Sequence, residues 1–337
     1  MFLKASLDWF LGKRGSHMGL EQYAAHAGMR VGQPTSGDLL WAAAEAERAA
    51  AAGNMVNAET GMLQNKVANE IGFYVPEGTT LIELGPGTIT AFRNKTLPLI
   101  RKLAIKNCVL VDESKAFLKQ IMKAKDISQG LKIETIVADF FENDIAYCGK
   151  PAVICSFGST ISNIINPIST DLPEKALVDG LVRLASAAKK GWLLIGFDSD
   201  QNGERIISYF KKYSLFQLNI FDRMAVELPI KGDFDPTAFG YEPEWIAESG
   251  QLAHIAVVKR NMNFTLDGKN ISLKKGQKLH IKNSYKFTTE FFEKCCKLTG
   301  LEVVKNWSDD SPAKVYLLKV PPKQPALNQR PVILRRA

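Results

Sequence analysis

The sequence has few of the features that anchor a chain in a membrane, cross-link it or bind a metal. No apolar run approaches the roughly 18 to 20 residues that a membrane-spanning helix needs, and Lys4 and Asp8 interrupt the start, where a secretory signal needs its apolar stretch. The 5 cysteines show no CxxC spacing, and the 4 histidines are scattered without ligand spacing. We therefore expect a cytoplasmic protein with reduced thiols, no metal and no membrane partner.

Composition gives no sign of disorder, and only a weak sign of nucleic-acid binding. The 337 residues are 46% hydrophobic and 23% charged, as in a globular chain with room for one large domain or two smaller ones. The net charge is +8, and the excess of lysine and arginine lies after residue 250. Nucleic acid or anionic lipid is attracted to such surfaces. A solvated sheet face is favoured instead, because the lysines alternate with strand-like apolar residues and no nucleic-acid-binding motif accompanies them.

Short apolar runs alternate with helical patterns in the middle of the chain. The sequence predicts strands at 79–84, 108–111, 132–137, 152–156 and 192–197, and helices at 91–105, 114–124 and 173–190. This alternation predicts an α/β fold with a Rossmann-like, doubly wound parallel sheet. A helix at 286–298 followed by two strand-like runs, 301–307 and 313–320, predicts an antiparallel hairpin at the edge of that sheet.

Outside this core, residues 1–60 form a lead-in and residues 200–283 are expected to form a second unit. Residues 1–60 contain helical patterns at 1–11 and 40–52, and residues 200–283 are rich in turns and then alternate as strands do. The Rossmann-like core is expected to comprise 61–199 and 284–320. The proline-containing residues 321–337 are expected to be a tail.

The strongest local signal is LIELGPGT at 81–88, in which a strand runs into a glycine turn and then a helix. Gly85 and Gly87 allow a ligand to approach the backbone at the carboxyl end of the first strand, where open α/β sheets bind nucleotides. The turn lacks both the GxGxxG spacing and the Lys-Ser/Thr pair of a P-loop. Glu83, just before the turn, suits a cationic amino-acid group better than a pyrophosphate.

The second and third strands also end in acids. Asp112 is placed to accept both hydroxyls of a ribose, and Asp139 with Phe140 is placed to contact the amino group and the face of an adenine. Each acid alone has another explanation, Asp112 as an acid at a helix start and Asp139 as a turn residue. Acids at three consecutive strand ends together favour a site for S-adenosylmethionine.

Eight motifs keep their order over roughly 59–319: IELGPGT, VDES, VADFFE, FGSTISNI, LIGFD, GDFDPTAF, NSYKF and NWSDD. In this the chain resembles the histidine-specific S-adenosylmethionine-dependent methyltransferases, which include the α-N-methyltransferases of ergothioneine biosynthesis and the fungal dimethylallyltryptophan N-methyltransferases. The resemblance implies a methyltransferase core and a substrate-binding domain built from residues 1–60 and 200–283, with a small amino-acid-like substrate between them. Thr88 of the glycine turn, and Gly158 and Ser159 among the small and polar residues after the fourth strand, are further candidate cofactor contacts.

The resemblance also implies substrate-binding residues. Asn163 and Tyr209 match the asparagine and tyrosine that hold the α-carboxylate of the substrate, although Tyr209 also fits an ordinary helix position. Ser284 matches a serine that grips the histidine side chain, but Lys282 stands where the histidine-methylating members carry glutamate. His254 matches an apolar residue of the same pocket. The family's tyrosine-proline motif before the first strand is absent.

Lys282 changes which substrate is expected. An ammonium only donates hydrogen bonds, so it cannot accept one from an imidazole N–H as a carboxylate does. Histidine is therefore a doubtful substrate, and an anionic or hydrogen-bond-accepting side chain suits the pocket better.

The function predicted is methyl transfer from S-adenosylmethionine to the α-amine of an amino acid or of a small amino-acid-derived molecule, with S-adenosylhomocysteine as product. No catalytic side chain is assigned, because the sulfonium brings its own leaving group and the protein mainly has to orient the amine. Two alternatives stay open: transfer of the cofactor's aminocarboxypropyl group, and a cofactor-binding or partner-binding protein without catalysis.

Overall fold

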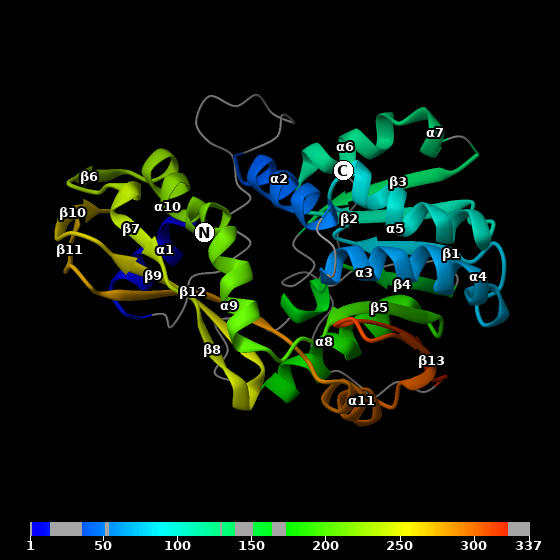
Figure 1. Ribbon diagram of the computed structural model, residues 1–337. Helices are drawn as coiled ribbons and strands as arrows, with labels where there is room; N and C mark the ends of the chain where they lie inside the picture. The colour runs from blue at the N-terminus through cyan, green and yellow to red at the C-terminus, as the bar shows by residue number, and fades with distance from the viewer. Residues whose placement is uncertain are drawn as a thin grey trace. The chain divides into compact units, whose positions relative to one another are not determined.

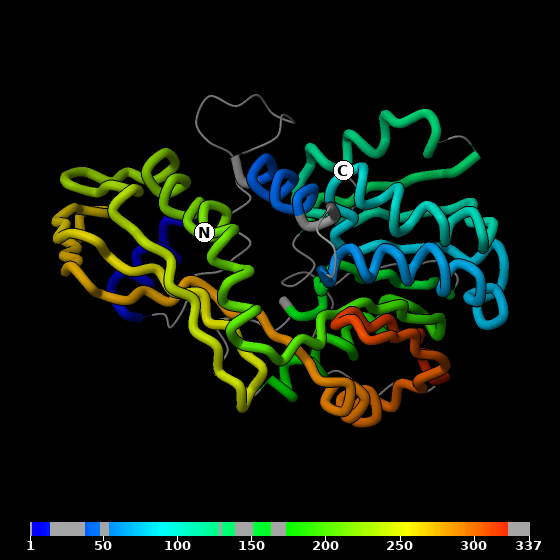
Figure 2. Tube along the Cα trace, viewed as in Figure 1, coloured from blue at the N-terminus to red at the C-terminus, as the bar shows by residue number. Residues whose placement is uncertain are grey.

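The computed structural model describes residues 2–13, 36–50, 54–128, 130–138, 151–163 and 173–322 (Figure 1). The chain divides into two compact units (Figure 2). The core unit comprises Glu45–Ile165, Asp171–Asp200 and Phe287–Ala337, and the second unit comprises Met1–Ala44, Asn166–Thr170 and Gln201–Lys286. Residues 45–60 thus belong to the core unit, whereas the expected core began at residue 61. The chain re-enters the core unit after Lys286, three residues later than expected.

The core unit is built on a seven-stranded sheet with the strand order β13-β14-β5-β4-β1-β2-β3. Its strands are β1 (Thr80–Leu84), β2 (Asn107–Asp112), β3 (Lys132–Val137), β4 (Ala152–Ser156), β5 (Trp192–Asp198), β13 (Glu302–Ser308) and β14 (Ala313–Lys319). Strands β1 to β5 are parallel, and β14 is antiparallel to both β5 and β13. The predicted α/β fold, its five parallel strands and its hairpin edge are confirmed.

Helices and short turns connect the strands of the core unit. They are α3 (Met55–Met62), the π-helix η2 (Leu63–Val67), α4 (Ala68–Glu70), η3 (Ile71–Phe73), α5 (Ile89–Lys102), α6 (Lys115–Lys123), α7 (Lys125–Ser128), η4 (Thr160–Asn163), α8 (Pro173–Ala188) and α11 (Thr289–Leu298). Hydroxyls of Thr88, Ser114 and Thr288 cap α5, α6 and α11 by accepting from backbone N–H groups three residues on. Helix α2 (Ser36–Ala50) begins in the second unit and ends in the core unit.

Burial explains why the central strands β1, β2, β4 and β5 are mainly apolar and do not alternate with polar residues. Leu81, Leu110, Val153 and Leu194, from four adjacent strands, are fully buried in one cluster with Phe92 of α5. Central parallel strands are covered on both faces, so the apolar runs of the sequence follow from their place in the sheet.

The described part of the second unit contains three complete helices, the start of α2 and two small sheets. The helices are α1 (Phe2–Phe10), α9 (Gly203–Lys212) and α10 (Ser214–Glu227), and short turns lie at η5 (Pro236–Ala238) and η6 (Ala247–Ser249). One sheet has the order β11 (Lys269–Leu273), β10 (Met262–Leu266), β6 (Ile230–Gly232); the other has β12 (Lys278–Tyr285), β9 (Gln251–Val258), β7 (Phe239–Tyr241), with β8 (Glu244–Ile246) also paired to β9. Phe221 of α10 stacks on Phe239 at 3.6 Å between ring centroids.

The described residues contain no helix long and apolar enough to cross a membrane, and no group of three potential metal ligands. The four cysteines that the structure describes are free and buried: Cys108, Cys155, Cys295 and Cys296. Burial raises the pKa of Cys295 to about 11, so this thiol stays protonated at neutral pH.

Candidate cofactor and acceptor sites

The glycine turn after β1 is tied to the end of β2. Gly85 and Gly87 have φ angles of +67° and +64°, in the left-handed region that glycine adopts without strain. The carboxylate of Asp112 accepts from Gly87 N (3.1 Å) through Oδ2 and from Ser114 N (2.8 Å) through Oδ1. The structure therefore brings Gly85, Gly87 and Asp112 together, and Asp112 holds the turn in shape.

Glu83 has a carboxylate oxygen without a hydrogen-bond donor. Its Oε1 accepts from Thr96 Oγ1 of α5 at 2.6 Å, whereas Oε2 is buried with no hydrogen-bond partner among the described residues. Burial raises the pKa of Glu83 to about 8, the nearby carboxylates of Asp112 and Glu59 add to this rise, and Thr96 and Lys95 oppose it. An unsatisfied buried acceptor two residues before the glycine turn fits the cationic group of a ligand.

This raised pKa predicts that cofactor binding depends on pH. Below about pH 8 the free protein holds a proton on Glu83, and a cation placed beside the carboxylate favours the ionised form. We expect S-adenosylmethionine to displace that proton at pH 7, so that its affinity rises with pH and levels off above about 8. Calorimetry in two buffers with different ionisation enthalpies measures the released proton. The Glu83→Gln variant should release none; an equal release from both proteins contradicts the prediction.

Thr88 has structural partners of its own. Its hydroxyl accepts from Ala91 N at 3.2 Å as the cap of α5, and donates to Glu45 Oε2 of α2 at 2.7 Å. Its role in contacting the cofactor stays a prediction.

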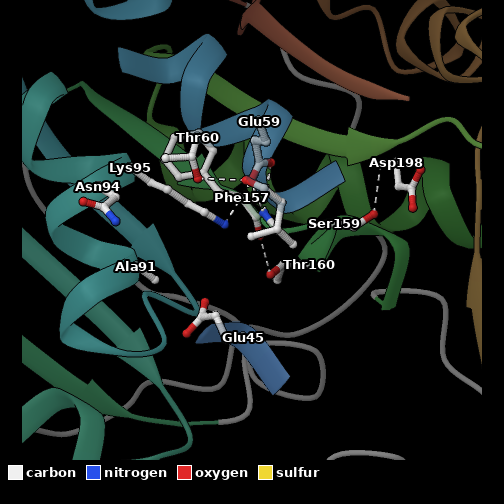
Figure 3. Close-up of polar contacts among 12 residues, drawn as sticks. Glu45, Glu59, Thr60, Ala91, Asn94, Lys95, Phe157, Ser159, Thr160 and Asp198 are labelled. Atoms are coloured by element: carbon white, nitrogen blue, oxygen red, sulfur yellow. Dashed lines mark hydrogen bonds and ion pairs between the residues drawn. The ribbon is translucent and has the colours of Figure 1, made fainter. Parts of the chain in front are cut away.

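The loop after β4 is held by a buried ion pair. Gly158 N is 2.9 Å from each carboxylate oxygen of Glu59 on α3, and Lys95 Nζ of α5 lies 3.0 Å from Glu59 Oε2 (Figure 3). The side chains of Glu59 and Lys95 are 0% and 8% exposed. A Cβ atom at Gly196 of β5 would overlap the Glu59 carboxylate, so only glycine leaves room for it.

Ser159 continues the same loop. Its φ is +64°, and its Oγ accepts from Asp198 N of β5 at 3.1 Å and lies 2.8 Å from Ser162 Oγ. The candidate cofactor residues Gly158 and Ser159 thus sit at the end of β4, which is the neighbour of β1. Glu59 and Lys95 were not predicted as site residues from the sequence. The signal that could have indicated them is Gly196, a glycine inside an apolar strand.

Three of the predicted site residues cannot be placed in full. Asp139 and Phe140 lie outside the described residues. Asn163 ends η4, and its side chain is not described. Their roles stay predictions.

A buried histidine lies at the centre of the predicted acceptor residues in the second unit. His254 of β9 is fully buried, and its Nδ1 is 2.7 Å from Tyr241 Oη while its Nε2 is 3.0 Å from Ser284 Oγ. Lys282 pairs directly opposite His254 across β12 and β9, so the two side chains share a face of the sheet. The structure therefore brings His254, Lys282 and Ser284 together. Tyr241 was missed, because its contact depends on the pairing of β7 with β9.

Aromatic rings and a second lysine surround this cluster. The ring of Phe210 packs edge-on against His254 with centroids 5.1 Å apart, and Tyr209 packs against Phe210 at the same distance. Lys286 is buried, with its Nζ 5.4 Å from the centroid of Phe210. Tyr209 is thus one ring away from His254.

Comparison with known proteins identifies the class of this chain. Residues 55–320 match the family described as histidine-specific methyltransferase, SAM-dependent. The chain is 39% identical over 303 residues to the uncharacterized protein y4iF of Sinorhizobium fredii (strain NBRC 101917 / NGR234), covering 84% of this chain and 99% of that protein. The protein is an S-adenosylmethionine-dependent methyltransferase. It belongs to the histidine-specific methyltransferase family.

Two solved structures to which the chain is similar are described as methyltransferases. The CcbJ methyltransferase from Streptomyces caelestis superimposes with a TM-score of 0.44 at 12% identity, covering 79% of this chain and 96% of that one. SAM-bound CalS10, an amino pentose methyltransferase from Micromonospora echinaspora, superimposes with a TM-score of 0.37 at 12% identity, covering 84% and 97%.

The residues at the ends of β1 and β2 fit the cofactor of this family. The unsatisfied oxygen of Glu83 suits the ammonium of its methionine part, the turn at Gly85 and Gly87 admits close backbone approach, and Asp112 suits the ribose hydroxyls. When bound, S-adenosylmethionine supplies an electrophilic methyl group together with its leaving group.

Proposed function

We propose that the protein methylates the α-amine of an amino acid, or of a small amino-acid-derived molecule, other than histidine. Membership of the family supports the amino-acid substrate, and Lys282 beside Ser284 and His254 supports the exclusion of histidine. The exclusion of histidine depends on one observation: Lys282, a cationic side chain, stands where histidine-methylating members have a carboxylate. Neither Lys282 nor any other described group of this cluster is an anion that accepts from an imidazole N–H.

Methyl transfer from S-adenosylmethionine to an amine requires no catalytic side chain. An amine attacks the methyl carbon only as the free base, and removal from water lowers the pKa of an ammonium because the charged form is disfavoured. The protein's contribution is then to bind the amine, keep water out and hold the nitrogen in line with the methyl group. No nucleophilic side chain is part of the proposal.

The test is an incubation of the full chain with S-adenosylmethionine and the twenty amino acids, each alone, with products separated by mass spectrometry. We expect S-adenosylhomocysteine and a product in which one amine hydrogen is replaced by methyl, with histidine giving none. Release of methylthioadenosine would instead indicate aminocarboxypropyl transfer. Cofactor binding without any product, from amino acids or from a metabolite extract, would contradict the enzymatic proposal and favour a non-catalytic role.

A further inference from the structure

Behind the glycine turn, the core unit has more buried acids than buried bases. The side chains of Glu83, Glu59 and Asp112 are buried, and all three belong to one electrostatic cluster. Lys95 is the buried cation of this cluster, and its Nζ is 3.0 Å from Glu59 Oε2. When all four groups are ionised, three carboxylates face one ammonium, so the cluster carries a net negative charge.

Glu83 is the acid of this cluster with an unsatisfied oxygen. Asp112 accepts from two backbone N–H groups, and Glu59 is paired with Lys95. Glu83 accepts from Thr96 Oγ1 through Oε1, whereas its Oε2 has no hydrogen-bond partner among the described residues. The carboxylate of Glu83 is therefore the one that a ligand's positive charge stabilises most.

Two thiols border Glu83 as well. Cys155 of β4 pairs directly opposite Glu83, and Cys108 of β2 lies on the same face of the sheet. Burial raises the pKa of both thiols well above the usual range, and the Glu83 carboxylate raises it further, so both thiols stay neutral. They add no positive charge that balances the carboxylate.

Methyl transfer changes the charge of the ligand in this site by one unit. S-adenosylmethionine carries an ammonium, a carboxylate and a sulfonium. In the transfer, the methyl carbon bonds to the acceptor nitrogen and leaves the sulfur, which keeps the electron pair and becomes the neutral thioether of S-adenosylhomocysteine. The ammonium and carboxylate are common to both ligands, so an electrostatic difference in affinity reports on the sulfonium.

We propose that Glu83 makes the site prefer S-adenosylmethionine to S-adenosylhomocysteine, so that affinity falls once the sulfur has lost its charge. This inference concerns the cofactor, and it does not depend on which amine is methylated. A carboxylate in a buried site attracts a cation more strongly than one in water does. The net charge of +8 of the whole chain acts in the opposite sense, so the preference is a local property of the buried acids.

The first test is calorimetry of the wild-type full chain at neutral pH with three ligands that differ at one position. S-adenosylmethionine has a sulfonium there, S-adenosylhomocysteine a neutral thioether, and sinefungin an amine-bearing carbon. We expect the two cationic ligands to bind about tenfold or more tightly than S-adenosylhomocysteine, the effect of two unit charges about 10 Å apart inside a protein. Equal or tighter binding of S-adenosylhomocysteine overturns the proposal without any variant.

The second test removes the charge of Glu83 and keeps its shape. In Glu83→Gln all three ligands should lose the contact with their shared ammonium, and the preference for the cationic ligands should fall to within about twofold of unity. Glu83→Asp keeps the charge and should keep most of the preference at lower affinity. Glu77→Gln, at an exposed glutamate of the core unit, should leave all three affinities within about twofold of the wild type.

Two further outcomes separate a charge effect from a structural one. If Glu83→Gln weakens all three ligands by the same factor, Glu83 binds the ammonium or shapes the turn without sensing the sulfonium, and the proposal is overturned. Raising NaCl from about 50 to about 500 mM should leave the wild-type preference within about twofold, because buried charges are screened little. A preference that disappears with salt arises from exposed charges and overturns the proposal.

Discussion

Replacing Glu59 by alanine is expected to lower the free energy of unfolding by about 3–5 kcal/mol, the usual cost of removing one partner of a buried ion pair. The change takes the carboxylate away from the buried ammonium of Lys95 and removes the acceptor of Gly158 N–H. It also leaves a void beside Gly196. We expect the loop after β4 to shift, so that activity falls as well.

The measurement is urea unfolding of the full chain, together with hydrogen exchange of the β4 and β5 amides, which reports on this unit alone. Glu77→Ala, the same substitution at an exposed residue of the core unit, should change the stability by less than about 0.5 kcal/mol. The double variant Glu59→Leu with Lys95→Met should be more stable than Glu59→Ala, because it leaves no buried charge. A Glu59→Ala variant as stable as Glu77→Ala would show that the pair contributes nothing.

The positions of the candidate cofactor residues could be predicted because they follow from the topology of a parallel sheet. Once the strands are recognised as apolar runs alternating with helices, the residues after them must meet at one edge. Glu83, Gly85 and Asp112 needed no further information. The bond from Asp112 to Gly87 N is the link between two strand ends that this reasoning expects.

The Glu59–Lys95 pair could not be predicted by the same reasoning. Lys95 lies in a predicted helix and Glu59 in a segment without a predicted element, and glutamate and lysine are ordinarily surface residues. Their burial depends on how α3 and α5 pack near β4 and β5, and sequence periodicity does not specify packing between helices. Helix α10 was missed because the surrounding residues 200–283 are rich in turn signals, although its buried residues Phe216, Ile220 and Met224 recur at helical spacing.

The histidine cluster was predicted in part. The resemblance placed His254, Lys282 and Ser284 in one pocket, but the contacts of His254 with Tyr241 and Ser284 depend on the register of three strands. Strand β12 has an irregularity between His280 and Lys282, and this is what sets Lys282 opposite His254. A shift by one residue would turn these side chains to the other face.

Asp112→Ala is expected to weaken the binding of S-adenosylmethionine and S-adenosylhomocysteine by about 100-fold or more. The carboxylate accepts two backbone N–H bonds that shape the glycine turn, and hydrogen bonds to charged groups contribute about 1.5–3 kcal/mol each. Asp112→Asn keeps one carbonyl oxygen and should lose about tenfold. Calorimetry at fixed pH measures both affinities.

Two comparisons decide what Asp112 does. Asp126→Ala, at an exposed aspartate of α7 paired with Arg93, should leave the affinity within about twofold of the wild type. An S-adenosylhomocysteine analogue lacking a ribose hydroxyl tests direct contact: if Asp112 binds that hydroxyl, the analogue binds the wild type more weakly, and Asp112→Ala binds both ligands alike. If the two losses simply add, Asp112 acts by holding the turn at Gly87, and the ribose contact is wrong. Unchanged affinity in Asp112→Ala would place the cofactor elsewhere on the sheet.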